Sequence, residues 1–264
     1  MTGDTALVPT PAAGIHLTTG TFEVIVAGLS SALTGLEAGS ARHLRTPPVI
    51  AREIIEKVGY AESFPHLLGR MIDSDLVLLP AGCYCVYPLY AAVRLESEIE
   101  VSVEATCFRA EAEAEPGRLR SFRMRELVRL DTAPRCLAWR DDRLAAAREW
   151  LAELGLEIES AVASDPFFGS GNRLLRALQV ERELKIELLA EVGPGQVQAV
   201  ASGNYHTDKF GRVFTIVDPD GEVAHTACLA FGYERLVLAL LHRHGSDPHS
   251  WPEQVRKTLG LGPA

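Results

Sequence analysis

Two segments with the residue pattern of β-strands follow one another in the middle of the chain. Residues 100–108 (EVSVEATCF) alternate and are rich in β-branched side chains, as strands are. Residues 113–117 (EAEPG) have turn composition, and residues 120–130 can return as the second strand. Because strands joined by a short connection pair antiparallel, this hairpin favours an antiparallel sheet over a doubly wound parallel one.

Patterns for helices and further strands flank this hairpin. Apolar spacing predicts helices over residues 21–36, 49–59, 144–156 and 231–244. Further strand patterns occupy residues 184–190, 196–202 and 213–217. We therefore predict an α+β fold, an antiparallel β-sheet flanked by helices. A flexible lead-in over residues 1–18 is expected to precede one domain over residues 19–264.

Composition narrows the class of protein. The chain has 264 residues, 47% hydrophobic and 23% charged, which suits one large domain with a sizeable core. Its apolar runs are too short to span a bilayer, and its N-terminus lacks a secretory signal pattern, so we expect a cytoplasmic protein without membrane association. A net charge of −9 argues against general nucleic-acid binding, although a local basic face can override the average. Five cysteines, an odd number, argue against a disulfide framework.

The first motif with chemical content begins at the end of the first strand. Arg109 and Glu111 are two residues apart, so a strand would present both on one face of the sheet. An arginine there can clamp a phosphate through two hydrogen bonds. Phe122 on the returning strand offers a stacking face for a base. By itself, this pattern is more typical of a hairpin with a charged, solvated face.

The second motif lies near the C-terminus, where residues 228–236 (CLAFGYERL) open the apolar helix. Gly232 permits a close approach of the backbone, and Arg235 at the helix start can point toward a phosphate. Taken alone, the segment is more typical of a buried helix with an arginine at its polar end.

Together and in this order, the two segments resemble motifs 2 and 3 of class II aminoacyl-tRNA synthetases. The shared pattern is Phe-Arg-x-Glu, a loop, Arg-x-x-x-Phe and, much later, Gly-x-Glu-Arg-Leu on a helix. A weaker match to motif 1, residues 45–48 (RTPP) after the first helix, implies a homodimer, because that motif lies at the family's dimer interface. The resemblance covers roughly residues 20–245 and implies a class II synthetase-like catalytic domain.

Within that class, the seryl-like branch is the most similar. Residues 122–126 (FRMRE) resemble its Phe-x-x-x-Glu, in which the Phe stacks on adenine and the Glu meets the substrate amine. Residues 202–208 (SGNYHTD) with Arg212 resemble its segment before motif 3. Gln198 stands where that branch usually has a metal-binding Glu, so the full set of magnesium ligands is not carried over. His206 is equally compatible with a structural role and with contact to substrate or ATP.

The chain has no room for the long tRNA-binding arm of seryl-tRNA synthetases and is similar to their truncated homologues, the amino acid:[carrier protein] ligases. Residues 79–84, 165–169 and 204–206 fit that group. The resemblance implies an AMP-forming ligase that activates a small amino acid (glycine, alanine or serine) with ATP as its adenylate. The aminoacyl group would then pass to the phosphopantetheine thiol of a carrier protein, with no tRNA involved.

The resemblance also implies roles for individual residues. Arg109 would bridge the α-phosphate and the carboxylate, and Arg235 would bind the γ-phosphate, which makes these two the catalytic residues. Glu111 would bind the adenine amine, and Phe122 would stack on adenine. Arg118 belongs to the same ATP-binding set, and Mg²⁺ would bridge the phosphates.

The ligase group and the atypical archaeal seryl enzymes hold zinc through Cys, Glu and Cys, which matches Cys83, Glu126 and Cys228. Three protein ligands with one open position are typical of a functional zinc site, and the open position can take the substrate amine. The spacing alone is more typical of two buried cysteines and a salt-bridged Glu. Cys85, two residues after Cys83, is the alternative ligand.

Residues 135–148, with Trp139, Arg140 and Arg143, are the predicted dock for an acidic carrier protein, against the simpler interpretation of an ordinary amphipathic helix. Two other functions stay open: a minimal tRNA-aminoacylating enzyme, and a non-catalytic regulatory paralogue that binds amino acid or adenylate. The net charge of −9 counts against the first. The combination of Arg109, Glu111 and Arg235 counts against the second.

Overall fold

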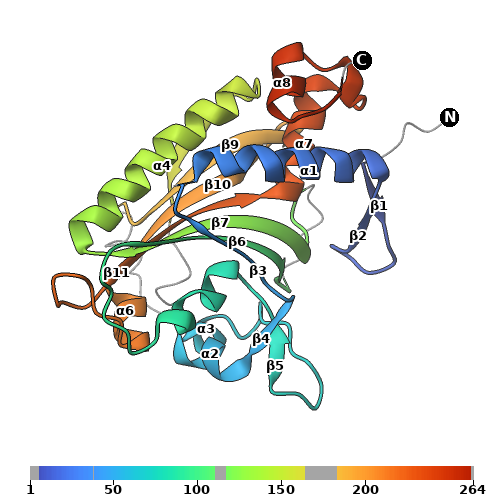
Figure 1. The fold of residues 1–264 in the computed structure, drawn as a ribbon. Coiled ribbons are helices and arrows are strands. Elements are labelled where there is room, and N and C mark those ends of the chain that lie inside the picture. Colours follow the sequence, from blue (N-terminus) through green and yellow to red (C-terminus); the bar gives the residue numbers. More distant parts are fainter. Residues whose placement is uncertain (1–5, 38, 111–116, 164–182, 263–264) are drawn as a thin grey trace.

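A seven-stranded sheet runs through the molecule and confirms the predicted α+β fold (Figure 1). The computed structural model describes residues 6–37, 39–110, 117–163 and 183–262. The first strand of the sheet pairs parallel with its neighbour, and all the other pairs are antiparallel. In spatial order the strands are β3 (Arg42–Arg45), β6 (Ile99–Phe108), β7 (Ser121–Asp131), β11 (His225–Gly232), β10 (Gln196–Thr207), β9 (Lys185–Gly193) and β8 (Glu159–Val162).

Helices cover both faces of this sheet, with α1, α4 and α7 over one face and α2, α3 and α6 near the other (Figure 1). Leu127 of β7 packs in the first apolar layer and Val128 in the second, because successive strand residues point to opposite faces. The helices are α1 (Gly20–Leu33), α2 (Arg52–Lys57), α3 (Tyr60–Ser63), α4 (Ala133–Glu153), α6 (Lys209–Phe214), α7 (Tyr233–His244) and α8 (Glu253–Thr258). Single 3₁₀ turns cover Thr34–Leu36, Gly82–Cys85, Tyr87–Tyr90 and Pro248–Ser250.

The central hairpin and the first helix agree with the sequence patterns. β6 and β7 pair in continuous register, from Ile99 opposite Leu130 to Phe108 opposite Ser121. α1 begins after Thr19, whose side chain accepts a hydrogen bond from the Phe22 amide and so satisfies one of the unpaired donors at the helix start.

Three predicted elements were wrong in part. Residues 49–51, predicted as helix, form β4 (Val49–Ala51), which pairs with β5 (Leu76–Leu78), and α2 follows it. Residues 213–217, predicted as a strand, begin at the end of α6, and Thr215 then takes a left-handed conformation. The helix predicted from residue 144 begins at Ala133. Tertiary pairing outweighs local propensity at residues 49–51, which is common for short apolar runs.

The N-terminal segment contains a small hairpin of β1 (Leu7–Pro9) and β2 (His16–Thr18). The division of the chain at residue 18 into a lead-in and a catalytic domain stays a prediction. Among the described residues, no helix combines the length and the apolar composition that a bilayer crossing requires.

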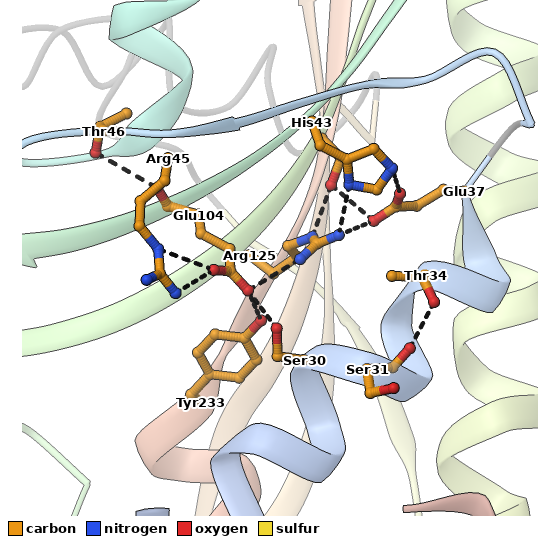
Figure 2. A network of polar contacts seen from close by, with 11 residues as sticks. Ser30, Ser31, Thr34, Glu37, His43, Arg45, Thr46, Glu104, Arg125 and Tyr233 are labelled. Carbon is orange, nitrogen blue, oxygen red and sulfur yellow. Dashed lines mark hydrogen bonds and ion pairs between the residues drawn. The ribbon is translucent and has the colours of Figure 1, made fainter.

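A network of polar and charged side chains joins α1 to the sheet edge (Figure 2). Arg125 of β7 forms ion pairs with Glu37 and with Glu104, the latter at 2.9 Å. Glu104 also accepts hydrogen bonds from Arg45 of β3 at 2.7 Å and from the Tyr233 hydroxyl at 2.9 Å. Ser30 of α1 also donates to Glu104, so the network ties together α1, β3, β6, β7 and the start of α7, the elements that hold the sequence motifs.

Candidate active site

A pocket of about 150 Å³ opens over the middle of the sheet, on the face that carries the turn Gly82–Cys85. Its floor comes from the four neighbouring strands β7, β11, β10 and β9. The residues predicted for the site that line this pocket are Arg109, Arg118, Phe122, Glu126, Cys228 and Arg235. Glu111 lies outside the described residues.

Strand register explains why these distant residues meet. Cys228 of β11 lies opposite Asn204 of β10, and Asn204 lies opposite Lys185 of β9. Ala230, two residues after Cys228, lies opposite Glu126 of β7. Because residues two apart share a face, the side chains of Glu126 and Cys228 point to the same side of the sheet.

Arginines dominate one end of the pocket. The Arg109 guanidinium lies over the Phe122 ring, 5.2 Å from its centroid, and its Nε donates to the Pro80 carbonyl at 3.2 Å. Arg235 Nε donates to the Gly117 carbonyl at 3.0 Å, and its Nη1 donates to the Ala199 carbonyl at 2.9 Å. Positive charges next to an aromatic ring form a site that suits a polyphosphate attached to a base.

Glu234 fixes the geometry at this end. Its two carboxylate oxygens accept hydrogen bonds from the Arg123 backbone amide at 2.7 Å and from Arg123 Nε at 2.9 Å. Arg123 also pairs with Glu23 of α1 at 2.7 Å. The start of α7, which carries Arg235, is thereby held against the strand that carries Phe122.

The other end of the pocket leads to a buried cluster of Cys83, Glu126 and Cys228. The Cys83 thiol hydrogen-bonds to both Cys228 and Glu126, and Glu126 Oε1 accepts the Gly82 amide at 2.5 Å. Glycine at position 82 allows this approach, because a Cβ there would lie 3.0 Å from Glu126 Oε1 and from Ala105 Cβ. Cys83, rather than Cys85, therefore has hydrogen bonds to both other members of the cluster.

Crowding of ionisable groups shifts the pKa values in this cluster. The hydrogen bond to Cys228 and burial hold the pKa of the Cys83 thiol well above its ordinary value. Burial, followed by the charge of Cys228, raises the pKa of Glu126 to about 7. The hydrogen bond from Cys83 lowers the pKa of the Cys228 thiol.

Two proteins of Bradyrhizobium diazoefficiens are similar to this chain over most of its length. The amino acid–[acyl-carrier-protein] ligase 1 is 37% identical, with 95% of this chain and 86% of that protein covered. The amino acid–[acyl-carrier-protein] ligase 2 is 36% identical, with 94% and 83% covered. The chain belongs to the amino acid–[acyl-carrier-protein] ligase family. No protein-family model matches this ligase.

More distant relatives place the ligase beside the seryl-tRNA synthetases. A type-2 serine–tRNA ligase of Methanococcus aeolicus is 26% identical over 82% of this chain and 44% of its own length. The M. kandleri SerRS in complex with A. aeolicus tRNASec shares the fold with a TM-score of 0.80 at 20% identity, covering 96% of this chain. The seryl-tRNA synthetase from Pyrococcus horikoshii complexed with ATP gives 0.76 at 18% identity, covering 95%. The ligase spans 58% of each of these two solved chains.

Within the described ranges of the ligase, no group of three or more His, Cys, Asp or Glu side chains has the arrangement of a metal site. Cys83 nevertheless hydrogen-bonds to Cys228 and to Glu126, and these three side chains carry the donor atoms predicted for zinc. Two thiols and one carboxylate match the ligand preferences of that ion.

Several pocket residues of the ligase were not singled out as site residues from the sequence. Asn204 Nδ2 donates to Cys228 Sγ at 3.4 Å, while its buried Oδ1 accepts no hydrogen bond from the part of the chain that the structure describes. Lys185 and Glu187 of β9 line the pocket as an ion pair at 3.0 Å. Alternation along a recognised strand would have placed Asn204 and Ser202 on one face, but the choice of face needed the strand partners.

The prediction that residues 135–148 form the docking surface for the carrier protein is wrong for its two central residues. Trp139 and Arg140 are buried, at 8% and 3% exposure, and therefore do not present themselves to a partner. Trp139 Nε1 donates to Glu100 at 2.8 Å, and Arg140 Nη1 donates to the Glu183 carbonyl at 2.5 Å. Arg135 remains on the surface of α4, with 61% of its side chain exposed.

Proposed function

We propose that this ligase activates a small amino acid with ATP and passes the aminoacyl group to the phosphopantetheine thiol of a carrier protein. The observation that carries the proposal is a single pocket with an arginine-rich end beside Phe122 and a buried Cys83–Glu126–Cys228 cluster at the other end. Identity of 37% to an amino acid–[acyl-carrier-protein] ligase over 95% of the chain supports the same activity.

In the first step, a carboxylate oxygen of the amino acid forms a bond to the α-phosphorus of ATP, and pyrophosphate leaves. Arg109, whose guanidinium lies over the Phe122 ring, would neutralise the carboxylate and the α-phosphate together, and Phe122 would stack against adenine. Arg235 and Arg118 would bind the outer phosphates, and Glu111 the adenine amine. Catalysis then rests on positioning and on stabilisation of the developing charge rather than on covalent chemistry by the protein.

In the second step, the carrier thiol attacks the carbonyl carbon of the adenylate, and AMP leaves. The thiol proton goes to the departing phosphate or to water, so no further reactant is required. Mg²⁺ would accompany the ATP phosphates. Gln198 provides a neutral oxygen where the seryl-like branch has a carboxylate, so the phosphates themselves would be the main ligands of the ion.

Zinc would be held by Cys83, Glu126 and Cys228 and would supply an open coordination position for the free amine of the substrate. The fit is supported by the electrostatics of the cluster. The hydrogen bond to Cys228 and burial raise the pKa of Cys83, and burial and the charge of Cys228 raise the pKa of Glu126. A divalent cation among them would offset that repulsion.

The proposal also includes that the ligase forms a homodimer and is located in the cytoplasm. The dimer would use α1 and β3, the elements that resemble motif 1. A surface groove of about 900 Å³ lies along them, lined among others by Ser30, Thr34 and Arg45. Sedimentation equilibrium tests this assembly, which predicts twice the mass of the chain.

The activity is tested by amino-acid-dependent ATP–pyrophosphate exchange with each of the twenty amino acids and zinc present. Exchange with glycine, alanine or serine is expected. Aminoacylation assays with a phosphopantetheinylated carrier protein and with tRNA as competing acceptors then identify the acceptor. Loading of tRNA would favour the minimal tRNA-aminoacylating enzyme, and no exchange from folded, zinc-loaded protein would favour the non-catalytic binder.

A further inference from the structure

Two fully buried polar residues, Tyr87 and His206, lie directly behind the cysteine cluster and have no role in the chemistry described above. Both have 0% exposure. Tyr87 belongs to the turn Tyr87–Tyr90, and His206 lies near the end of β10. Phe210 holds both rings in place: it stacks on Tyr87 at 4.2 Å between centroids and meets the His206 ring edge-on at 5.1 Å.

Their polar atoms reach the two sulfur atoms. His206 Nε2 lies 3.7 Å from Cys228 Sγ, and the Tyr87 hydroxyl hydrogen-bonds to Cys83. On the other side of the imidazole, Nδ1 lies 3.1 Å from the Thr226 hydroxyl and 3.4 Å from the Tyr87 hydroxyl. Each sulfur of the cluster therefore lies next to a buried polar group from outside the cluster.

One tautomer of His206 is compatible with all of these hydrogen bonds. In the tautomer in which Nδ1 of His206 accepts from the Thr226 hydroxyl, Nε2 is the protonated nitrogen that faces Cys228. The Tyr87 hydroxyl is then available to donate to Cys83.

The net charge of the proposed zinc site explains why hydrogen bonds to its sulfur atoms would stabilise it. Two thiolates and a carboxylate bring three negative charges to a zinc ion with two positive charges. The remaining negative charge is buried, and a buried charge is costly unless hydrogen bonds stabilise it. Donors aimed at the ligand atoms spread that charge and fix the ligands in position, as outer-shell residues of metal sites commonly do.

We infer that Tyr87 and His206 are positioning residues that hold the sulfur atoms of Cys83 and Cys228 as zinc ligands, with Thr226 orienting the imidazole. The inference rests on the zinc site of the proposed function. It adds a second layer of residues around the ligands of that site.

The test measures metal binding by the full-length chain in wild type and in variants, through chelator competition for Zn²⁺ and absorption spectra of the Co²⁺-substituted protein. His206→Leu and Tyr87→Phe remove the donors while keeping most of the volume, and Thr226→Val removes only the hydroxyl that orients the imidazole. His206→Gln keeps an N–H near the position of Nε2. Tyr205→Phe is the matched control, because it removes a hydroxyl from the neighbouring residue of β10 that contacts His225 instead.

We expect zinc affinity to fall about 10- to 100-fold in His206→Leu and by less in Tyr87→Phe and Thr226→Val. The sulfur-to-cobalt charge-transfer band should shift in the same variants, His206→Gln should recover part of the loss, and Tyr205→Phe should match wild type. Wild-type affinity and an unshifted cobalt band in folded Tyr87→Phe and Thr226→Val would overturn the inference while leaving the zinc site intact. A wild-type chain that binds neither metal would overturn the zinc site and this inference together.

Discussion

Asn204 Nδ2 lies 3.4 Å from Cys228 Sγ, across the neighbouring strands β10 and β11. This contact links the wall of the pocket to the cysteine cluster. The other end of the same side chain, Oδ1, is buried at the pocket without a hydrogen-bond partner in the described ranges. A buried acceptor in this position suits a donor on the substrate, such as the amine or a side-chain hydroxyl.

Asn204→Ala is expected to raise the KM for the amino acid about 10-fold or more, because a hydrogen bond to a charged group contributes about 1.5–3 kcal/mol. The KM for ATP should change little, since Asn204 lies at the cluster end of the pocket. Steady-state pyrophosphate exchange separates the two constants. An equal rise in both would show that the variant disturbs the whole pocket.

Arg235→Ala is expected to lower the rate of pyrophosphate exchange by about 10²–10³-fold, the range found when one preorganised donor to transition-state charge is removed. Arg243→Ala is the matched control, because Arg243 lies on the same helix but is exposed and pairs with Glu157. The control should keep wild-type exchange. Similar losses in both variants would point to damage to α7 rather than to phosphate binding.

Cys83→Ser is expected to abolish zinc binding and exchange, whereas Cys85→Ser should retain both. The reason is that Cys83 hydrogen-bonds to Cys228 and Glu126 together. Zinc content measured by plasma mass spectrometry, before and after dialysis against 1,10-phenanthroline, checks the prediction in both variants. Loss of zinc in Cys85→Ser alone would assign the ligand to Cys85.

The Glu104–Arg125 pair predicts acid sensitivity. Burial alone would raise the pKa of Glu104, but hydrogen bonds from Ser30, Arg45 and Tyr233, with the charge of Arg125, lower it from 4.5 to about 2. The unfolded chain thus binds a proton at higher pH than the folded chain does. The stability from this carboxylate is fully present above pH 4.5 and is lost as the pH falls through about 2.

Urea unfolding of wild type and Glu104→Gln between pH 7 and pH 3 measures this contribution. The difference in free energy of unfolding between the two proteins should be constant near neutral pH and should shrink below about pH 4.5. A difference that does not depend on pH would show that Glu104 acts through packing and not through its charge.

Arg140→Glu is expected to destabilise the fold by about 3–5 kcal/mol, because it leaves an unpaired charge in a buried position. Arg135→Glu on the exposed side of α4 should change stability by about 0.5 kcal/mol or less. If α4 contacts the carrier protein, Arg135→Glu will keep pyrophosphate exchange and slow carrier loading. Unchanged loading with an acidic carrier would exclude Arg135 from the docking surface.

Local patterns were sufficient for the elements with strong periodicity. The alternation over residues 100–108 and the apolar spacing over residues 21–36 correspond to β6 and to α1 with its final turn. Residues 49–51 and 213–217 were not predictable in the same way, because short apolar runs are compatible with either a helix or a strand until a partner is known.

The sequence by itself determined which residue types were available for adenylate chemistry and in what order, and through them the resemblance to the class II synthetases. Only the tertiary structure decided which of these side chains meet. Cys83 and Cys228 are far apart along the chain, and the packing of the turn Gly82–Cys85 against the sheet, through the hydrogen bond from the Gly82 amide to Glu126, brings them into contact. The tertiary structure also buried Trp139 and Arg140, which the predicted carrier dock had placed on the surface. The physical reason is that strand pairing and burial are long-range properties, whereas periodicity reports only neighbours along one element.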